Sequence, residues 1–303
     1  MKKIIAFVLI MLFVLSGCGS DVAKAQFFCP ACWYDPANYE MQDYDHGTVL
    51  TGTELEKYKD IFAKVCEFAG FEKEMPVIVE VSKEVLAEML HVTPEDAYAA
   101  FVRPNKIYVT SNPNNQQLTH EMLHYMSTDG KVVTRGLVYE KDGYEMGRYL
   151  NEGVTDYFSF WICGISPLVE GPYEYERYVA ECLTTLVGMD EMKKAYFNAD
   201  VSGLREMVNE SLKDIYESQV DAYGVTLDQF DIFATSLSGY YRCLAYGSED
   251  SVKLAIATMN SIEEMVVKMS QKLGMEDTIK AKQKDFLKAY PHLDAITEFR
   301  KMW

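Results

Sequence analysis

The sequence has little histidine and tryptophan and no excess of positive charge. Its 303 residues include five histidines and three tryptophans, and the formal net charge at pH 7 is −17. An acidic chain repels the phosphates of nucleic acids and the headgroups of anionic lipids. We therefore expect no nucleic-acid partner, and we expect any membrane attachment to depend on something other than a basic surface.

Long apolar runs are missing beyond the N-terminus. Only residues 4–15 are continuously apolar, and this run is shorter than the about 20 residues that a membrane-spanning helix needs. Lys2 and Lys3 precede it, which is the pattern of an export signal. The rest of the chain is therefore expected to be a folded, exported protein.

The export signal ends in a short motif that contains a cysteine. Residues 15–18 read Leu-Ser-Gly-Cys, which resembles the lipobox of bacterial lipoproteins. The resemblance implies a signal peptide over 1–17 and an acylated Cys18 at the start of the mature chain. The alternative is an ordinary secretory signal cut near Gly19. With the lipobox, the protein is extracytoplasmic and anchored to the bacterial cell membrane by its N-terminal lipid alone.

Cysteine pairs are scarce in the mature chain. Cys29 and Cys32 form a CxxC pair, but no second pair follows to complete a four-cysteine zinc site, and no predicted strand precedes it as in a thioredoxin-like unit. We favour a disulfide or an inert pair over a redox dithiol. The other cysteines lie in apolar stretches, where we expect small buried side chains: Cys66, Cys163, Cys182 and Cys243.

The chain has no internal repeat and no low-complexity tract. Residues 18–50 lack a period and are expected to form a tether and an irregular wrap. Residues 51–165 mix helix and strand signals, and residues 166–303 are almost wholly helical. The sequence therefore predicts an α+β fold in which a small mixed sheet with its helices precedes a mainly helical C-terminal half.

Local signals set the expected element bounds. Capping-box patterns start helices at Thr51 and Ser261, and Gly274 stops the second one. A strand is expected over 77–81, a hairpin over 99–110, and further strands around 132–134 and 137–139. Helices are expected over 51–70, 115–126 and 146–162.

The helix over 115–126 contains the motif His120-Glu121-Met122-Leu123-His124. Residues i and i+4 lie on one face of a helix, so His120 and His124 can direct both imidazoles to one zinc ion. Glu121 lies beside His120 and can reach a water at the metal without binding the ion itself. It is the predicted general base for hydrolysis.

Catalytic zinc needs a third protein ligand, and the sequence narrows the choice. The metzincin spacing would require glycine at Ser127 and histidine at Gly130, and both are absent. An acidic ligand is therefore expected. Glu152 is the main candidate, with Asp142 as a weaker substitute, although Glu152 alone would be an acid in the first turn of a helix beside the capping residue Asn151.

Residues 149–158 read Tyr-Leu-Asn-Glu-Gly-Val-Thr-Asp-Tyr-Phe. This segment resembles the NExxxD element of thermolysin-like gluzincins and the NEG pattern of other gluzincins. The resemblance implies that Glu152 is the third zinc ligand and that Asp156 accepts a hydrogen bond from a ligand histidine. Independently, Glu152 and Asp156 are i and i+4 on one helix face.

The resemblance covers the two motif helices and the strand before them, about a quarter of the chain by eye. It implies a zincin-like fold and a zinc-dependent metallopeptidase that holds one zinc and acts on a peptide or protein substrate. By analogy, residues 106–110 would form the exposed edge strand that pairs with extended substrate. Candidates for stabilising the oxyanion are Tyr144, Tyr240 and Tyr241, and the 21 tyrosines give no basis for choosing among them.

Two other functions remain open. One is a surface lipoprotein that binds zinc or a partner at a relic site without catalysis, and the other is a surface lipoprotein without metal. An intact Glu121 favours the enzyme, because a purely structural metal site needs no base. The sequence leaves open the substrate, the cleavage specificity and the oligomeric state.

Overall fold

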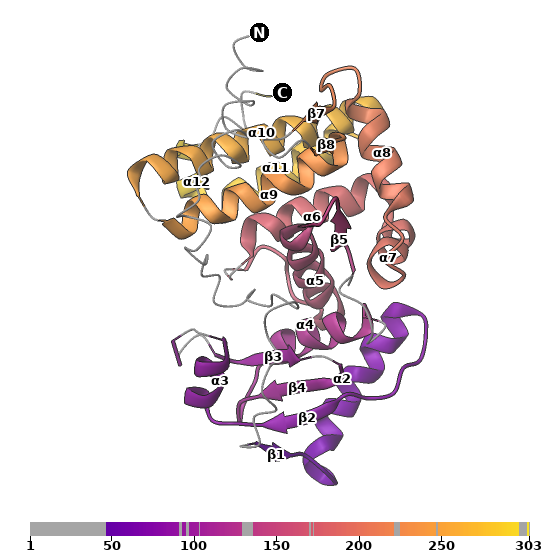
Figure 1. Ribbon diagram of the computed structural model, residues 1–303, viewed down its shortest axis with the longest axis vertical. Coiled ribbons are helices and arrows are strands. Elements are labelled where there is room, and N and C mark those ends of the chain that lie inside the picture. The colour runs from indigo at the N-terminus through magenta and orange to yellow at the C-terminus, as the bar shows by residue number, and fades with distance from the viewer. Residues whose placement is uncertain are drawn as a thin grey trace. The chain divides into compact units, whose positions relative to one another are not determined.

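The computed structural model describes residues 47–90, 93–94, 97–102, 104–128, 136–169, 171, 173–220, 225–246, 248–296 and 302 (Figure 1). The side chains of residues 144, 220, 242, 245, 246 and 294–296 are not described. The predicted signal peptide, Cys18, Cys29, Cys32, the strand at 132–134 and the side chain of Tyr144 therefore lie outside the described part. No described helix combines the length and the apolar character needed to cross a membrane.

The predicted α+β class is confirmed, with small sheets among many helices. The described residues fall into two compact units. The α/β unit holds those up to Gly136 together with Thr155–Pro167, and the helical unit holds Leu137–Val154 and those from Leu168 onward. The boundary cuts through one continuous helix, α5 (Arg148–Cys163).

The α/β unit is built on a four-stranded mixed sheet with the order β1-β2-β4-β3. Its strands are β1 (Thr48–Val49), β2 (Val77–Glu80), β3 (Ala99–Val102) and β4 (Lys106–Val109). β2 runs parallel to β4, whereas β1 and β3 pair antiparallel with their neighbours. The strand predicted over 77–81 is therefore present as β2. Strands β3 and β4 form the hairpin expected over 99–110.

The predicted edge strand is wrong. Residues 106–110 correspond to β4, which pairs with β2 on one side and with β3 on the other, so its backbone is not available to a peptide. The edge beside it is β3. The sequence could not reveal this, because the β2–β4 pairing joins segments that are far apart in the chain and depends on tertiary packing.

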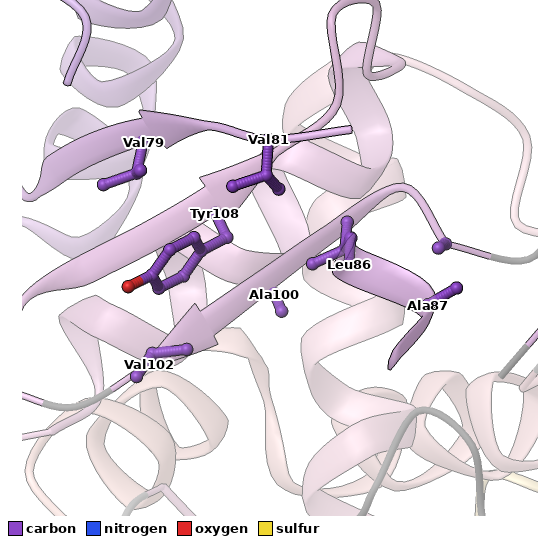
Figure 2. Packing of buried hydrophobic residues seen from close by; sticks show 8 residues of the cluster. Val79, Val81, Leu86, Ala87, Ala100, Val102 and Tyr108 are labelled. Carbon is purple, nitrogen blue, oxygen red and sulfur yellow. The ribbon is translucent and has the colours of Figure 1, made fainter. Parts of the chain in front are cut away.

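Alternation along the strands gives the sheet two apolar faces. On one face, Val79, Tyr108 and Ala100 lie opposite one another across β2, β4 and β3, and Leu86 and Ala87 of α3 (Lys83–Leu90) pack against them (Figure 2). On the other face, the rings of Phe101 and Tyr125 meet edge to face at 5.8 Å. Tyr125 belongs to α4 (Asn115–Met126), so the sheet supports the helix that carries the HExxH motif.

Both predicted capping boxes are wrong. The first helix, α2, spans Thr53–Ala69, and its N-cap is Gly52, without a side-chain cap. Ser261 lies inside the long helix α10 (Glu249–Leu273), where its hydroxyl donates to the carbonyl of Ala257. The motif Ser-x-x-Glu also fits a helix interior, because serine can bond to the preceding turn. Gly274 does end α10, as expected.

The helical unit begins with the hairpin β5 (Tyr139–Lys141) and β6 (Tyr144–Met146) and the first turns of α5. Its further helices are α6 (Glu174–Val187), α7 (Met189–Phe197), α8 (Ser202–Leu212), α9 (Gln229–Tyr246), α10, α11 (Glu276–Ala289) and α12 (Pro291–Ile296). Two short antiparallel strands, β7 (Gln219–Val220) and β8 (Thr226–Leu227), lie between α8 and α9 in the chain. Among the cysteines, Cys66, Cys182 and Cys243 are buried as predicted, whereas Cys163 is half-buried.

An ion network around one buried carboxylate ties the hairpin to the helices of this unit. Asp231 of α9 is fully buried, accepts a hydrogen bond from the Tyr139 hydroxyl at 2.7 Å and pairs with Lys141. Arg205 of α8 lies 3.0 Å from the same carboxylate and 2.5 Å from Asp228. Two cations and two carboxylates thus balance, which is what allows charge in an interior. The network fixes the strand from which the chain enters α5.

Candidate metal centre

Contacts at both ends of helix α4 hold this helix, and with it the HExxH motif, in place. At the N-terminus, the Asn114 side chain accepts a hydrogen bond from the Gln117 amide at 3.0 Å, as a capping residue does. At the other end, Lys73 Nζ lies 2.6 Å from the carbonyl oxygens of both Tyr125 and Thr128. A cation is favourable there, because the last carbonyls of a helix lack partners and carry partial negative charge.

The two motif histidines converge as their spacing predicts. His120 Nε2 and His124 Nε2 lie 3.1 Å apart, and both side chains are buried. Two nitrogens bound to one tetrahedral zinc ion would lie about 3.3 Å apart. The pair is therefore already close to the separation that a shared metal ion requires.

Glu152 completes the group. Donor atoms of His120, His124 and Glu152 all lie within 4.8 Å of one another, and all three residues are buried. Glu152 is on α5, four residues before Asp156, so both carboxylates share one face of the helix. Two imidazoles and one carboxylate form a donor set that suits catalytic zinc. Asp142 lies in the turn of the β5–β6 hairpin and does not belong to this group.

Asp156 faces the outer nitrogen of His120. Its Oδ1 lies 3.5 Å from His120 Nδ1, and the residue is 2% exposed. A proton on Nδ1 would be attracted to this carboxylate, which leaves the lone pair on Nε2 for a metal. The Asp156 carboxylate thus lies on one side of the His120 imidazole, and the place where a metal could bind lies on the other.

The carboxylate of Glu121 lies against the edge of the sheet. Its Oε2 accepts a hydrogen bond from the backbone amide of Phe101 on β3 at 2.7 Å. Glu121 is half-buried, whereas the neighbouring His120 is buried. Glu121 does not belong to the group of three donors.

The residues on either side of Glu152 each make a specific contact. The Asn151 side-chain oxygen accepts a hydrogen bond from the Leu137 amide at 3.0 Å, and Asn151 is fully buried. A Cβ on Gly153 would lie only 2.4 Å from the carbonyl oxygen of Glu176 on α6, so this position needs glycine for close approach of two backbones. The helix expected over 146–162 is present as α5, which begins at Arg148. The alternative role of Asn151 as a helix cap is wrong, because Asn151 lies inside α5 and accepts from the Leu137 amide of the preceding segment.

The tyrosine candidates for oxyanion stabilisation fall in different places. Tyr240 is buried, its ring packs against Tyr175 at 4.9 Å, and burial together with Glu176 and Glu174 raises its pKa. Tyr241 stacks at 4.5 Å on Tyr149, which lies in the first turn of α5. Tyr241 is thus the candidate that contacts the helix bearing Glu152. Tyr144 forms part of β6, and its side chain lies outside the described part.

Three features of the centre were not predicted from the sequence. They are the contact of Lys73 with the carbonyls at the end of α4, the backbone amide that donates to Glu121, and the position of Gln116. The Gln116 side chain contacts Asp156. Only Gln116 had a usable signal, since it lies four residues before His120 and therefore on the same helix face. The other two depend on contacts between segments far apart in the chain.

No protein-family model, no curated protein and no solved structure matches the chain. The assignment of chemistry to this centre therefore rests on its own residues.

Proposed function

We propose that the protein is a zinc-dependent peptidase that hydrolyses peptide bonds, with His120, His124 and Glu152 as metal ligands and Glu121 as general base. The observation that carries the proposal is the convergence of three buried donors, with the two imidazole Nε2 atoms 3.1 Å apart. Two imidazoles and one carboxylate gathered at one buried place form a donor set that suits catalytic zinc.

Zinc in this position would supply Lewis acidity, which makes water a stronger acid near neutral pH and polarises a peptide carbonyl. The protein's own contributions are separate from that chemistry. Asp156 keeps His120 in the orientation that directs Nε2 inward. Glu121 accepts a proton from water and passes it to the leaving amine, and the Phe101 amide keeps its carboxylate at the end of β3.

The edge strand β3 is the part of the sheet that can accept an extended substrate. In the antiparallel pair with β4, the Phe101 amide points away from β4, because it donates to Glu121. The carbonyl of Phe101 points the same way as its amide and is the acceptor that a peptide strand would use. Substrate would thus lie beside the proposed base.

We further propose that the enzyme works outside the cell, held to the bacterial membrane by a lipid on Cys18. The support is the charged start, the apolar run and the Leu-Ser-Gly-Cys sequence at the N-terminus. Labelling with a radioactive fatty acid, compared between the natural chain and Cys18→Ala, tests this part. Equal labelling of both would reject lipidation at Cys18.

The enzymatic proposal is tested on the soluble chain that begins after Cys18. The protein is incubated with a diverse peptide mixture, with and without a zinc chelator, beside Glu121→Gln, and products are identified by mass spectrometry. We expect cleavage that the chelator and the substitution both abolish, while Glu121→Gln still binds one zinc. A Glu121→Gln protein with full activity would contradict the assigned base.

The same experiment separates the other functions. A wild-type protein that binds one zinc but cleaves nothing would favour a non-catalytic zinc-binding lipoprotein. A wild-type protein without affinity for zinc would reject the metal centre and with it the peptidase. Titration of zinc against a chromophoric chelator gives the stoichiometry and the affinity together.

A further inference from the structure

Gln116 lies in the first turn of α4, one turn before His120, and reaches across to α5. Its side-chain nitrogen Nε2 is 2.7 Å from Asp156 Oδ1 and 2.8 Å from Ser159 Oγ. These are ordinary lengths for N–H···O bonds, and an amide nitrogen has two hydrogens to donate. One side chain of α4 therefore holds two side chains of α5.

Ser159 is arranged to receive this donor. Its hydroxyl donates to the backbone carbonyl of Asp156 at 2.7 Å, so the oxygen lone pairs remain for Gln116. Ser159 and Asp156 are both buried. The three side chains form a small polar cluster in which Gln116 is the member that comes from the histidine-bearing helix.

The same oxygen of Asp156 serves both neighbours. Oδ1 accepts from Gln116 Nε2 and lies 3.5 Å from His120 Nδ1. A carboxylate oxygen has lone pairs for two donors, and its position fixes the direction of the imidazole that it meets. The side-chain amide of Gln116 is thus linked to the His120 imidazole by way of Asp156.

The choice of a neutral amide has a chemical consequence. A lysine or arginine at this place would neutralise the carboxylate and weaken its pull on the His120 proton. The amide of Gln116 satisfies and aims Asp156 without cancelling its charge. The negative charge thus stays available to His120, which is the property that makes an imidazole a better metal ligand.

We propose that Gln116 is a positioning residue of the metal centre, which orients Asp156 and through it His120. The proposal rests on the zinc-binding part of the proposed function and extends it by one residue. Outer partners of metal ligands change metal affinity about 10- to 100-fold when they are removed. Because Gln116 acts one step further out, we expect a loss of about tenfold.

The test is a double-mutant cycle on zinc affinity, measured by competition with a chromophoric chelator. The four proteins are the soluble wild type, Gln116→Leu, Asp156→Ala and the double variant. Gln116→Leu should weaken zinc binding about tenfold in the wild-type background and by less than about twofold when Asp156 is absent. If Asp156→Ala does not fold, Asp156→Asn takes its place in the cycle. The asparagine lacks the negative charge that Gln116 orients toward His120 in the wild type.

Two further readouts exclude a merely structural effect. The visible absorption of the cobalt(II)-substituted protein reports the coordination geometry and should change in Gln116→Leu. Gln283→Leu is the matched control, because Gln283 also donates its amide to a buried carboxylate, Glu263 Oε1, at 2.5 Å in the helical unit. The control should lower thermal stability and leave zinc affinity and the cobalt spectrum unchanged.

The outcomes separate the two proposals. A wild type that binds no zinc rejects the proposed function itself. A wild type that binds zinc, with Gln116→Leu folded and equal to it in affinity and cobalt spectrum, overturns the role of Gln116 alone. Losses that add fully in the double variant also overturn it, because they would show that Gln116 does not act through Asp156.

Discussion

His120 Nδ1 lies 3.5 Å from Asp156 Oδ1, on the opposite side of the imidazole from the atom that faces His124. The ring is therefore held between a carboxylate and a second imidazole. Such a placement favours a proton on Nδ1, where the N–H bond would meet the negative charge of Asp156. It also makes the contribution of Asp156 measurable.

Asp156→Asn should lower zinc affinity about 10- to 100-fold and leave the fold intact. The side chain keeps its size and can still accept from Gln116, but the charge that attracts the His120 proton is lost. The measurement is chelator competition at constant pH. Asp200→Asn, at a half-buried aspartate of the helical unit that pairs with Lys194, serves as control and should bind zinc like wild type. Equal affinity of Asp156→Asn and wild type would mean that His120 does not depend on the carboxylate.

Asn151→Leu should weaken zinc binding and lower the free energy of unfolding by roughly 1–3 kcal/mol. The substitution leaves the amide of Leu137 buried without its acceptor and loosens the segment that carries Glu152. Chemical denaturation and zinc titration measure the two effects.

A matched control exists on α8. Asn209 Oδ1 accepts from the Phe230 amide at 2.8 Å, far along the chain from the metal donors. Asn209→Leu should lose similar stability and keep its zinc affinity. If both variants lowered zinc affinity alike, Asn151 would have no special role.

Gly153→Ala should destabilise the protein by roughly 1–3 kcal/mol, although alanine normally favours a helix over glycine. The added methyl would meet the Glu176 backbone at 2.4 Å and force α5 and α6 apart. Thermal unfolding measures the change. Gly171→Ala is the control, because its Cβ would meet only Arg177 at 3.4 Å, so the melting temperature should stay near that of wild type. A melting temperature raised by Gly153→Ala would contradict the close packing.

Glu263 should make stability depend on pH. Burial raises its pKa to about 7, against the lowering effect of hydrogen bonds from Gln283 and Tyr178, and Cys182 and Tyr175 lie near enough to feel its charge. The unfolded carboxyl has its ordinary pKa near 4.5. The folded state therefore binds the proton more tightly, so this contribution is fully present below the unfolded pKa and is lost as pH rises from about 4.5 to about 7.

Glu263→Gln removes this titration and keeps an oxygen for both donors. We expect the variant to exceed wild type in stability at pH 8 by on the order of 3 kcal/mol, and the difference to shrink toward pH 4.5. Urea unfolding between pH 4.5 and 8 measures it. Parallel pH profiles of the two proteins would show that Glu263 stays charged inside the fold.

Local patterns were enough for the elements that depend on neighbouring residues. The helix over 115–126 has the predicted bounds, and Asn114 caps its N-terminus. His120 and His124 converge because four residues make about one helical turn. No fold beyond α+β follows from these patterns, and the zincin-like architecture stays a prediction.

Tertiary structure decided what depends on distant segments. The parallel pairing of β2 with β4 moved the edge to β3, and helix continuity through Ser261 overrode a capping pattern that sequence alone favoured. The contacts of Gln116 with Asp156 and of Asn151 with Leu137 likewise arise only when separate segments pack together. The sequence by itself determined which side chains are candidates for the chemistry, because the spacing within each motif follows from local helix geometry. Packing between distant segments decided how those side chains are oriented, because that depends on contacts that no local pattern encodes.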